Sequence, residues 1–301
     1  MESKGITQKQ ALGVALLAIV VNSFTSTFLS MILGKGMDSS VVTCYRMLIV
    51  SLIMLPWAFS RREYRDNLKS IPGGIWKLFA IYCFTKLGGF VLWAESLRMG
   101  ASAFTMTTLS NMQPIFIVVF LYILYKERTS LRSLGGIAVC LVGVTIIGIE
   151  NVTAFGSPLV MLVIIACCCC NALNNVFGRK VRLHMDLIPM MGISYFVAGI
   201  MAGIYAAMGG ASFAVPREAI LPLLGVSLGC TLLGHSMNMW CLKYIKSVTM
   251  SLISLLSPFC TAVSAYFMLG EVPQPIVFVG ALFMIAGLVL YQRAENHVKT
   301  K

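Results

Sequence analysis

Two basic residues lie inside long apolar stretches of the chain, where a charge is costly. Lys86 lies near the centre of the stretch at 74–97, and Arg46 lies in the stretch at 39–59. A charged side chain in such a position is expensive to bury and usually serves a function. Tyr82 precedes Lys86 by one helical turn, so the two side chains can share a face. This pattern predicts that Lys86 binds an anionic group, such as a carboxylate, with Arg46 as a second contact. Alternatively, both cations only brace neighbouring helices.

A second set of residues in these stretches offers polar side chains that are uncharged at neutral pH. Polar side chains within membrane helices often only bond neighbouring helices, and a Trp can also anchor a helix at the membrane interface. Lining a substrate path is the other interpretation. On that interpretation the further substrate-binding candidates are Asn22, Ser26, Trp93, Asn111, Asn171, Asn174, His235 and Asn238.

The chain offers little for catalysis or metal binding. Cys167–Cys170 are consecutive, so on a helix they point to all sides and cannot converge on one ion. The ten cysteines are interpreted as polarisable filler without a disulfide framework. His235 and Ser236 are adjacent and diverge on a helix, with no nucleophile elbow or paired carboxylates. We therefore predict no enzyme, no catalytic residue, no metal site and no cofactor.

The composition indicates the medium in which the chain folds. It is 58% hydrophobic and 11% charged, with a mean hydropathy of +0.87. Soluble domains carry about a quarter charged residues, so this chain is predicted to be a helical integral membrane protein. The net charge of +12 raises nucleic-acid binding as an alternative, but the basic residues cluster between apolar stretches, as orientation signals do. The expected partners are a small-molecule substrate and the lipid bilayer, with no nucleic acid and with a homodimer left open.

A helical crossing of a bilayer needs about 20 apolar residues. The first apolar stretch is too long for the core of a signal peptide and is expected to remain as a helix. Ten stretches approach the required length, and we predict a transmembrane helix at each of 11–33, 39–59, 74–97, 101–125, 132–149, 157–178, 186–208, 219–241, 246–269 and 275–292.

The basic residues between these stretches predict an orientation. If the ten segments cross the membrane in turn, the segment ends on one side carry 17 Lys and Arg residues. The ends on the other side carry three, which are Lys35, Arg98 and Arg217. Lys and Arg are enriched in cytoplasmic loops, which places both termini in the cytoplasm. The expected location is the plasma (inner) membrane, crossed many times, with an organelle membrane as the alternative.

One stretch of the chain occurs twice, at 105–146 and at 249–290. The two copies are 144 residues apart and share nine identities in 42 ungapped positions. The shared residues include the pairs Pro114/Pro258, Glu127/Glu271, Gly136/Gly280 and Gly143/Gly287. A repeat of this kind decides architecture, so we predict two domains, 1–150 and 151–301, each with five helices.

Five is an odd number, so the second half must enter the membrane from the side opposite to the first. The predicted fold is therefore all-α and integral to the membrane, with ten transmembrane helices as two inverted five-helix repeats. Such repeats are typical of secondary transporters, which bind substrate near the midplane and work by alternating access.

The repeated residues suggest mechanical roles. Pro114 and Pro258 are expected inside helices, where each kink either shapes a cavity as a hinge or serves packing alone. Glu127 and Glu271 follow those helices and are either gates or solvated terminal charges. The paired glycines lie seven residues apart, so they share a face, and they predict close packing of the helices at 132–149 and 275–292.

Several of these residues resemble the pattern of the EamA family of the drug/metabolite transporter superfamily. They are Ser96-Leu97-Arg98, Pro114, Lys126-Glu127-Arg128, Gly136 and Gly143 in the first half, and Cys241-Leu242-Lys243, Pro258, Gly270-Glu271, Gly280 and Gly287 in the second. The resemblance covers essentially the whole chain. It implies ten helices in two repeats, and export or exchange of a small metabolite, often an amino acid, or of a drug-like compound.

The function predicted from these observations is secondary transport of a small polar metabolite across the plasma membrane. An amino acid or related carboxylate, moved outward by alternating access, is the leading substrate class because of Lys86 and Arg46. A multidrug exporter is the first alternative, although buried positive charges disfavour cations. A membrane scaffold or receptor that does not transport is the second alternative.

Overall fold

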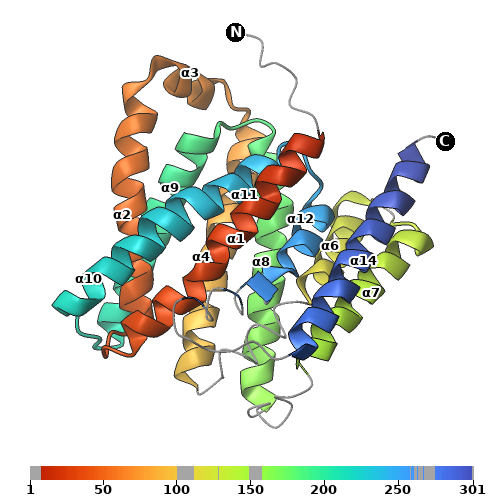
Figure 1. Ribbon diagram of the computed structural model, residues 1–301. Coiled ribbons are helices and arrows are strands. Elements are labelled where there is room, and N and C mark those ends of the chain that lie inside the picture. The colour runs from red at the N-terminus through yellow and green to blue at the C-terminus, as the bar shows by residue number, and fades with distance from the viewer. Residues whose placement is uncertain are drawn as a thin grey trace. The chain divides into compact units, whose positions relative to one another are not determined.

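The computed structural model describes residues 8–99, 112–127, 129–148, 158–257, 259–260, 263, 267 and 275–299. The regular elements in these residues are helices (Figure 1), as the continuous apolar stretches predict. They are α1 (Gln8–Leu33), α2 (Ser39–Ser60), α3 (Arg62–Ser70), α4 (Gly73–Arg98), α6 (Gln113–Tyr125), α7 (Leu131–Gly148), α8 (Pro158–Arg182), α9 (Leu187–Met208), α10 (Arg217–Leu224), η2 (Gly225–His235), α11 (Ser236–Cys241), α12 (Ser247–Ser254) and α14 (Pro275–Lys299).

Several helices are long and apolar enough to cross a membrane. In the described part of the chain there are six of them, at Lys9–Leu33, Ser39–Ser60, Gly73–Trp93, Pro158–Arg182, Leu187–Met208 and Arg217–Cys241. Shorter apolar helices lie at Gln113–Tyr125, Leu131–Gly143 and Phe278–Ala294. These helices establish a multi-pass membrane protein, and the count of ten crossings stays a prediction.

The chain packs as two compact units that do not follow the two halves of the sequence. Unit 1 comprises Met1–Val91 and Phe177–Lys246, and unit 2 comprises Leu92–Val176 and Ser247–Lys301. Each unit therefore takes segments from both sides of residue 150. The division into repeats at 1–150 and 151–301 remains a prediction about the sequence.

In unit 1, α2 and α9 pack side by side along much of their length (Figure 1). A Cβ atom added to Gly192 would lie 3.2 Å from Leu55, and one added to Gly199 would lie 2.8 Å from Leu48. Moving forward along α9 thus means moving backward along α2, so the two helices are antiparallel. They are the second helices of the two predicted repeats.

The helix α1 runs antiparallel to the continuous helical segment formed by α10, η2 and α11. The Sγ atom of Cys230 donates a hydrogen bond to the carbonyl of Val21 at 3.3 Å, and that of Cys241 donates to Ala11 at 3.4 Å. The middle part of the segment, η2, is a π-helix, a rare form that is frequent at functional sites. These contacts hold η2 against the centre of α1.

In unit 2, α7 packs directly against α14, the fifth helices of the two predicted repeats (Figure 1). A Cβ atom on Gly136 would lie 2.6 Å from the backbone nitrogen of Tyr291, and one on Gly143 would lie 2.5 Å from the carbonyl oxygen of Gly280. The predicted close packing at these glycines is confirmed. The order of the contacts makes this pair antiparallel as well.

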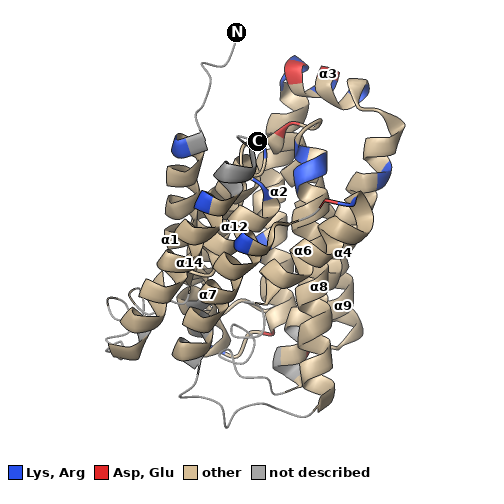
Figure 2. Cartoon of the chain, turned by 90° about the vertical axis from the view of Figure 1, so that its right-hand side faces the viewer, with Lys and Arg blue, Asp and Glu red and all other residues tan. Residues whose placement is uncertain are grey.

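One end of unit 1 carries a short helix, α3, that the apolar pattern did not predict. None of its residues is buried, and it bears basic and acidic side chains (Figure 2). Asn67 in α3 accepts a hydrogen bond from the backbone nitrogen of Asp186 at 3.0 Å and donates one to the carbonyl of His184 at 3.3 Å. The basic loops after α2 and after α8 therefore meet at the same end of unit 1.

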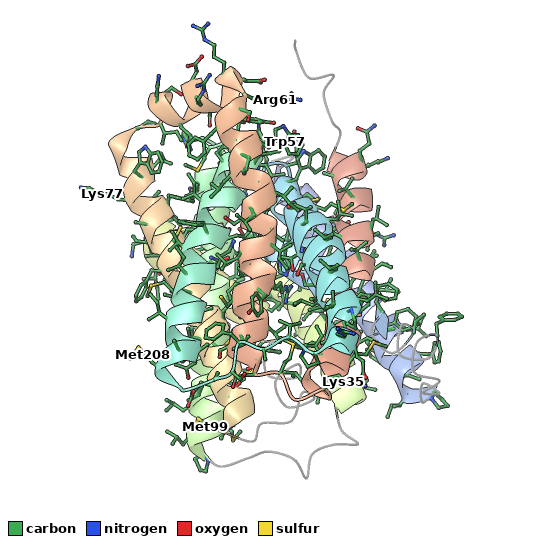
Figure 3. All side chains as sticks on the ribbon, turned by 90° about the vertical axis from the view of Figure 1, so that its left-hand side faces the viewer. Lys35, Trp57, Arg61, Lys77, Met99 and Met208 are labelled. Atoms are coloured by element: carbon green, nitrogen blue, oxygen red, sulfur yellow. The ribbon has the colours of Figure 1, made fainter. Side chains whose placement is uncertain are left out.

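The two ends of unit 1 differ in their charged contacts. Arg61 lies over the ring of Trp57 at the α3 end, whereas Lys35 lies at the opposite end (Figure 3). Lys35 forms an ion pair with Glu218 at 2.5 Å, which joins the end of α1 to the start of α10. Both side chains are largely exposed, so water screens this pair and it contributes little to stability.

Candidate functional site

Lys86 is buried in unit 1, with 7% of its surface exposed. Its Nζ atom donates a hydrogen bond to the Oγ atom of Ser194 at 3.0 Å. The same atom lies 4.9 Å from the ring centroid of Tyr82 and 4.2 Å from that of Tyr195. The expected shared face of Tyr82 and Lys86 is thus present, and a second ring from α9 completes an aromatic enclosure around the ammonium group.

Tyr82 itself is fully buried and is held by contacts from three helices. Its hydroxyl lies 3.7 Å from the sulfur of Met239 and 3.9 Å from the sulfur of Met191. Its ring passes close to Gly178, where an added Cβ atom would lie 3.0 Å from the ring. Packing of this density fixes the ring and, through it, the position of Lys86.

Arg46 is the second buried cation, and it comes from α2. Its Nε atom donates to the hydroxyl oxygen of Thr231 in η2, and that hydroxyl donates to the carbonyl of Val226 at 2.8 Å. Arg46 lies within electrostatic range of Tyr195, whose ring also covers Lys86. The two cations therefore approach the same tyrosine from α2 and α4.

Neither cation forms an ion pair with a carboxylate in the part of the chain that the structure describes. The ion pairs found there, Lys35–Glu218 and Arg62–Asp66, lie on exposed side chains elsewhere. Removing a cation from water costs several kcal/mol unless an anion or a set of hydrogen bonds replaces the water. Two such cations without a counter-ion form a site suited to an anionic ligand.

His235, predicted from the sequence, lies where η2 ends and α11 begins. It is within electrostatic range of both Arg46 and Lys86. The preceding residue, Gly234, touches the side chain of Asn22 in α1. The structure thus brings Arg46, Tyr82, Lys86 and His235 near one another and places Asn22 against η2. Asn238 lies in α11, also in unit 1.

Other predicted residues belong to unit 2. Asn171 donates a hydrogen bond from Nδ2 to the sulfur of Cys167 at 3.6 Å, and Asn174 is buried in α8. Trp93 packs against Val160 and Ile164 in an apolar cluster. Asn111, Pro258, Glu271 and the side chain of Ser26 lie outside the described residues. A role in substrate binding or gating stays a prediction for these residues.

Pro114 was predicted inside a helix, and it lies in α6, in the first turn of the described helix, which begins at Gln113. A proline in this position removes no helical hydrogen bond, because the first-turn N–H groups have no partner in the helix. In the second repeat, α12 ends at Ser254, and Leu255 and Leu256 form a turn. Residues 100–111 and Pro258 lie outside the described part of the chain, so the hinge role stays a prediction.

Glu127 is exposed just beyond α6, and its backbone nitrogen bonds to the carbonyl of Leu121 at 3.2 Å. The preceding residue, Lys126, has a φ angle of 56°, in the left-handed region that favours glycine. This turn ends α6 and presents Glu127 to the surface. The gate role of Glu127 stays a prediction.

Replacing Lys126 by glycine should stabilise the fold by about 1 kcal/mol relative to Lys126→Ala, because a Cβ atom is strained in the left-handed region. Both variants lose the cationic side chain, so the difference between their unfolding free energies reports only the strain of a Cβ atom in the left-handed conformation. Thermal unfolding of the two purified variants in one detergent measures it. Equal midpoints would show that the turn relaxes without cost.

Three residues of the site were not predicted from the sequence. Ser194 and Tyr195 lie in the middle of α9, and Thr231 lies in η2. The sequence offers a weak signal for the first two, a Ser-Tyr pair within an otherwise apolar stretch. Their contacts with Lys86 and Arg46 span more than 100 residues of sequence and become visible only in the fold.

Comparisons with known proteins match this architecture. The model of the EamA-like transporter family matches residues 10–149 and 158–292. A protein of Archaeoglobus fulgidus described as an uncharacterized transporter is 25% identical over 296 residues, which cover 94% of this chain and 97% of the relative. A solved crystal structure superposes with a TM-score of 0.81 at 13% identity, covering 96% of this chain and 99% of the other, which shows a shared fold.

Proposed function

Because the chain belongs to the EamA-like transporter family, we propose that it is a secondary transporter of a small polar metabolite that carries a carboxylate, such as an amino acid or a related acid. The observation that carries the proposal is the pair of buried cations, Lys86 and Arg46, without a carboxylate partner among the described residues. A substrate anion supplies the missing counter-charge. Lys86 and Arg46 bind the anion, and Tyr82 orients Lys86.

Two features of the fold support transport by alternating access. The second helices of the two repeats, α2 and α9, are antiparallel, and so are the fifth helices, α7 and α14. Equivalent helices that cross in opposite directions are what an inverted repeat produces. The second feature is the π-helical segment η2, which carries Thr231, the hydrogen-bond partner of Arg46. Short π-helices are frequent at functional sites.

The proposed cellular setting follows the distribution of basic residues. In unit 1 the basic loops after α2 and α8 meet at the α3 end, which we assign to the cytoplasm. Both termini are then cytoplasmic, in a plasma membrane. We assign an outward direction of transport, because the resemblance to the EamA family implies export or exchange. We assign no catalytic step to the chain.

Counterflow in liposomes tests the proposal without knowledge of a driving ion. The purified protein is reconstituted and offered labelled amino acids, small organic acids, nucleosides and a cationic dye against the same unlabelled compound inside. We expect exchange of at least one carboxylate-bearing solute. Exchange of the dye alone would instead indicate a multidrug exporter, and binding without exchange would indicate a receptor or scaffold.

A further inference from the structure

Asn22 lies near the middle of α1, and its amide group has no hydrogen-bond partner among the described residues. Both its Oδ1 and its Nδ2 atoms are buried, and neither bonds to any residue that the structure describes. Leaving a buried amide unpaired costs free energy, and nearly all buried polar groups in proteins are paired. The Asn22 amide is therefore a donor and an acceptor that a ligand can satisfy.

Gly234 determines where this amide lies. A Cβ atom added to Gly234 would be 2.6 Å from Oδ1, 2.8 Å from Cγ and 3.0 Å from Nδ2 of Asn22. All three amide atoms thus lie over the bare Cα atom of the glycine. Any larger residue at position 234 must push the amide aside, because real Cβ contacts are not this short.

Other buried polar atoms of unit 1 also lack a partner among the described residues, and they are uncharged. The hydroxyl of Tyr195, on a side chain only 1% exposed, has no partner among the described residues. The same holds for Oγ of Ser236 and Oδ1 of Asn238, which follow Gly234 by two and four positions. The ring of Tyr195 covers Lys86. Asn22 contacts Gly234 in η2, and Arg46 bonds to Thr231 in the same helix, so η2 links the Asn22 amide to the cationic residues.

The described residues of unit 1 offer no acidic residue inside a long helix to receive a positive group; Glu95 of α4 lies nine residues beyond Lys86 and belongs to unit 2. The described carboxylates of unit 1 belong to Asp38, Glu63, Asp66, Asp186 and Glu218, which lie in α3, in connecting turns or at the start of α10. The faces of Tyr82 and Tyr195 already hold the ammonium group of Lys86. Among the described residues of unit 1, a ligand ammonium would therefore meet two like charges and only neutral acceptors.

We propose that the ligand joins an anionic group to an uncharged hydrogen-bonding group, as in a hydroxy acid or an N-acylated amino acid, and that a free zwitterionic amino acid is disfavoured. The carboxylate lies at Lys86 and Arg46, and the hydroxyl or amide lies at Asn22. This inference rests on the proposed function, which it narrows to one class of carboxylate.

Matched solutes test this selectivity in reconstituted liposomes. Propionate, lactate, alanine and N-acetylalanine share a three-carbon skeleton, and the corresponding phenyl-substituted acids test a larger size. We expect the hydroxy acid or the N-acetyl amino acid, in the three-carbon or the phenyl series, to exchange at least about tenfold faster than the amino acid and the unsubstituted acid of the same series. A tenfold difference corresponds to about 1.4 kcal/mol, which is on the scale of one hydrogen bond.

Two variants connect the selectivity to the amide. Asn22→Leu removes its hydrogen bonds at similar volume, and Gly234→Ala displaces it while leaving it in the chain. Both should make exchange of the hydroxy or N-acyl acid about as fast as exchange of the unsubstituted acid, so that the preference is lost. Gly229→Ala is the matched control in η2, because a Cβ atom there meets nothing within 4 Å.

The outcomes separate this inference from the proposed function. Exchange of free amino acids as fast as the hydroxy or N-acyl acids would overturn the inference and leave the transporter of carboxylates intact. An unchanged preference in both Asn22→Leu and Gly234→Ala would overturn the role of the amide. Exchange of the cationic dye alone would overturn the proposed function, and the inference with it.

Discussion

Gly136→Ala is expected to destabilise the protein, whereas Gly135→Ala, one residue earlier in the same helix, is not. A methyl group on Gly136 would lie 2.6 Å from the backbone of Tyr291 and 2.9 Å from the carbonyl oxygen of Gly287, so α7 and α14 must separate to admit it. Overpacking of this kind costs about 1–3 kcal/mol, and here the obstructing atoms are backbone, which cannot rotate away. A larger residue, as in Gly136→Leu, should prevent correct folding.

Gly135 provides the matched control, because a Cβ atom there meets nothing within 4 Å. Alanine favours the helix over glycine by up to about 1 kcal/mol, so Gly135→Ala should be neutral or slightly stabilising. Thermal unfolding in detergent and the yield of monodisperse protein measure both variants. If Gly136→Ala and Gly135→Ala unfold at the same temperature, the contact between α7 and α14 is looser than the distances indicate.

Lys86→Met is expected to slow anion exchange strongly without unfolding the protein. A charge-assisted contact contributes about 1.5–3 kcal/mol, so the substitution should slow exchange of a carboxylate by about ten- to a hundredfold. Folding should be retained or improved, because methionine matches the volume of the lysine stem and removes a buried cation. Counterflow and thermal unfolding on the same preparation separate the two effects.

Lys77→Met is the control for this prediction. Lys77 lies on the same helix, α4, but is exposed, and Figure 3 shows it at the outer side of unit 1. Its loss should leave exchange unchanged. Normal transport by Lys86→Met would mean that the lysine only braces the helices, and the anion site would have to be sought elsewhere.

The parts of the site that the sequence could predict are local in the chain. Lys86 is a single charge within an apolar stretch, and Tyr82 lies four residues before it, so helix geometry alone pairs them. The glycines at 136 and 143 were also identifiable, because their spacing repeats 144 residues later. Each of these inferences needs only the helical period and the repeat.

The contacts that complete the site could not be predicted in this way. Ser194 and Tyr195 reach Lys86, and Thr231 reaches Arg46, across separations set by how the helices pack. A short charged segment such as α3 has no apolar pattern that would mark it as a helix. The position of Pro114 within a longer helix stays a prediction, because residues 100–111 lie outside those that the structure describes.

The contact between α7 and α14 is close to self-complementary. Gly136 of the first repeat corresponds to Gly280 of the second, and Gly143 corresponds to Gly287, each at an offset of 144 residues. Gly136 contacts Gly287, and Gly143 makes the equivalent contact with Gly280. Cys140 and Met284, which are equivalent by the same offset, meet at the centre, where the cysteine donates to the carbonyl of Met284 at 3.3 Å. This is the isologous geometry of a two-fold symmetric dimer. A gene encoding one half alone would already carry the surface needed to pair with an oppositely inserted copy of itself, so duplication and fusion would preserve an existing interface.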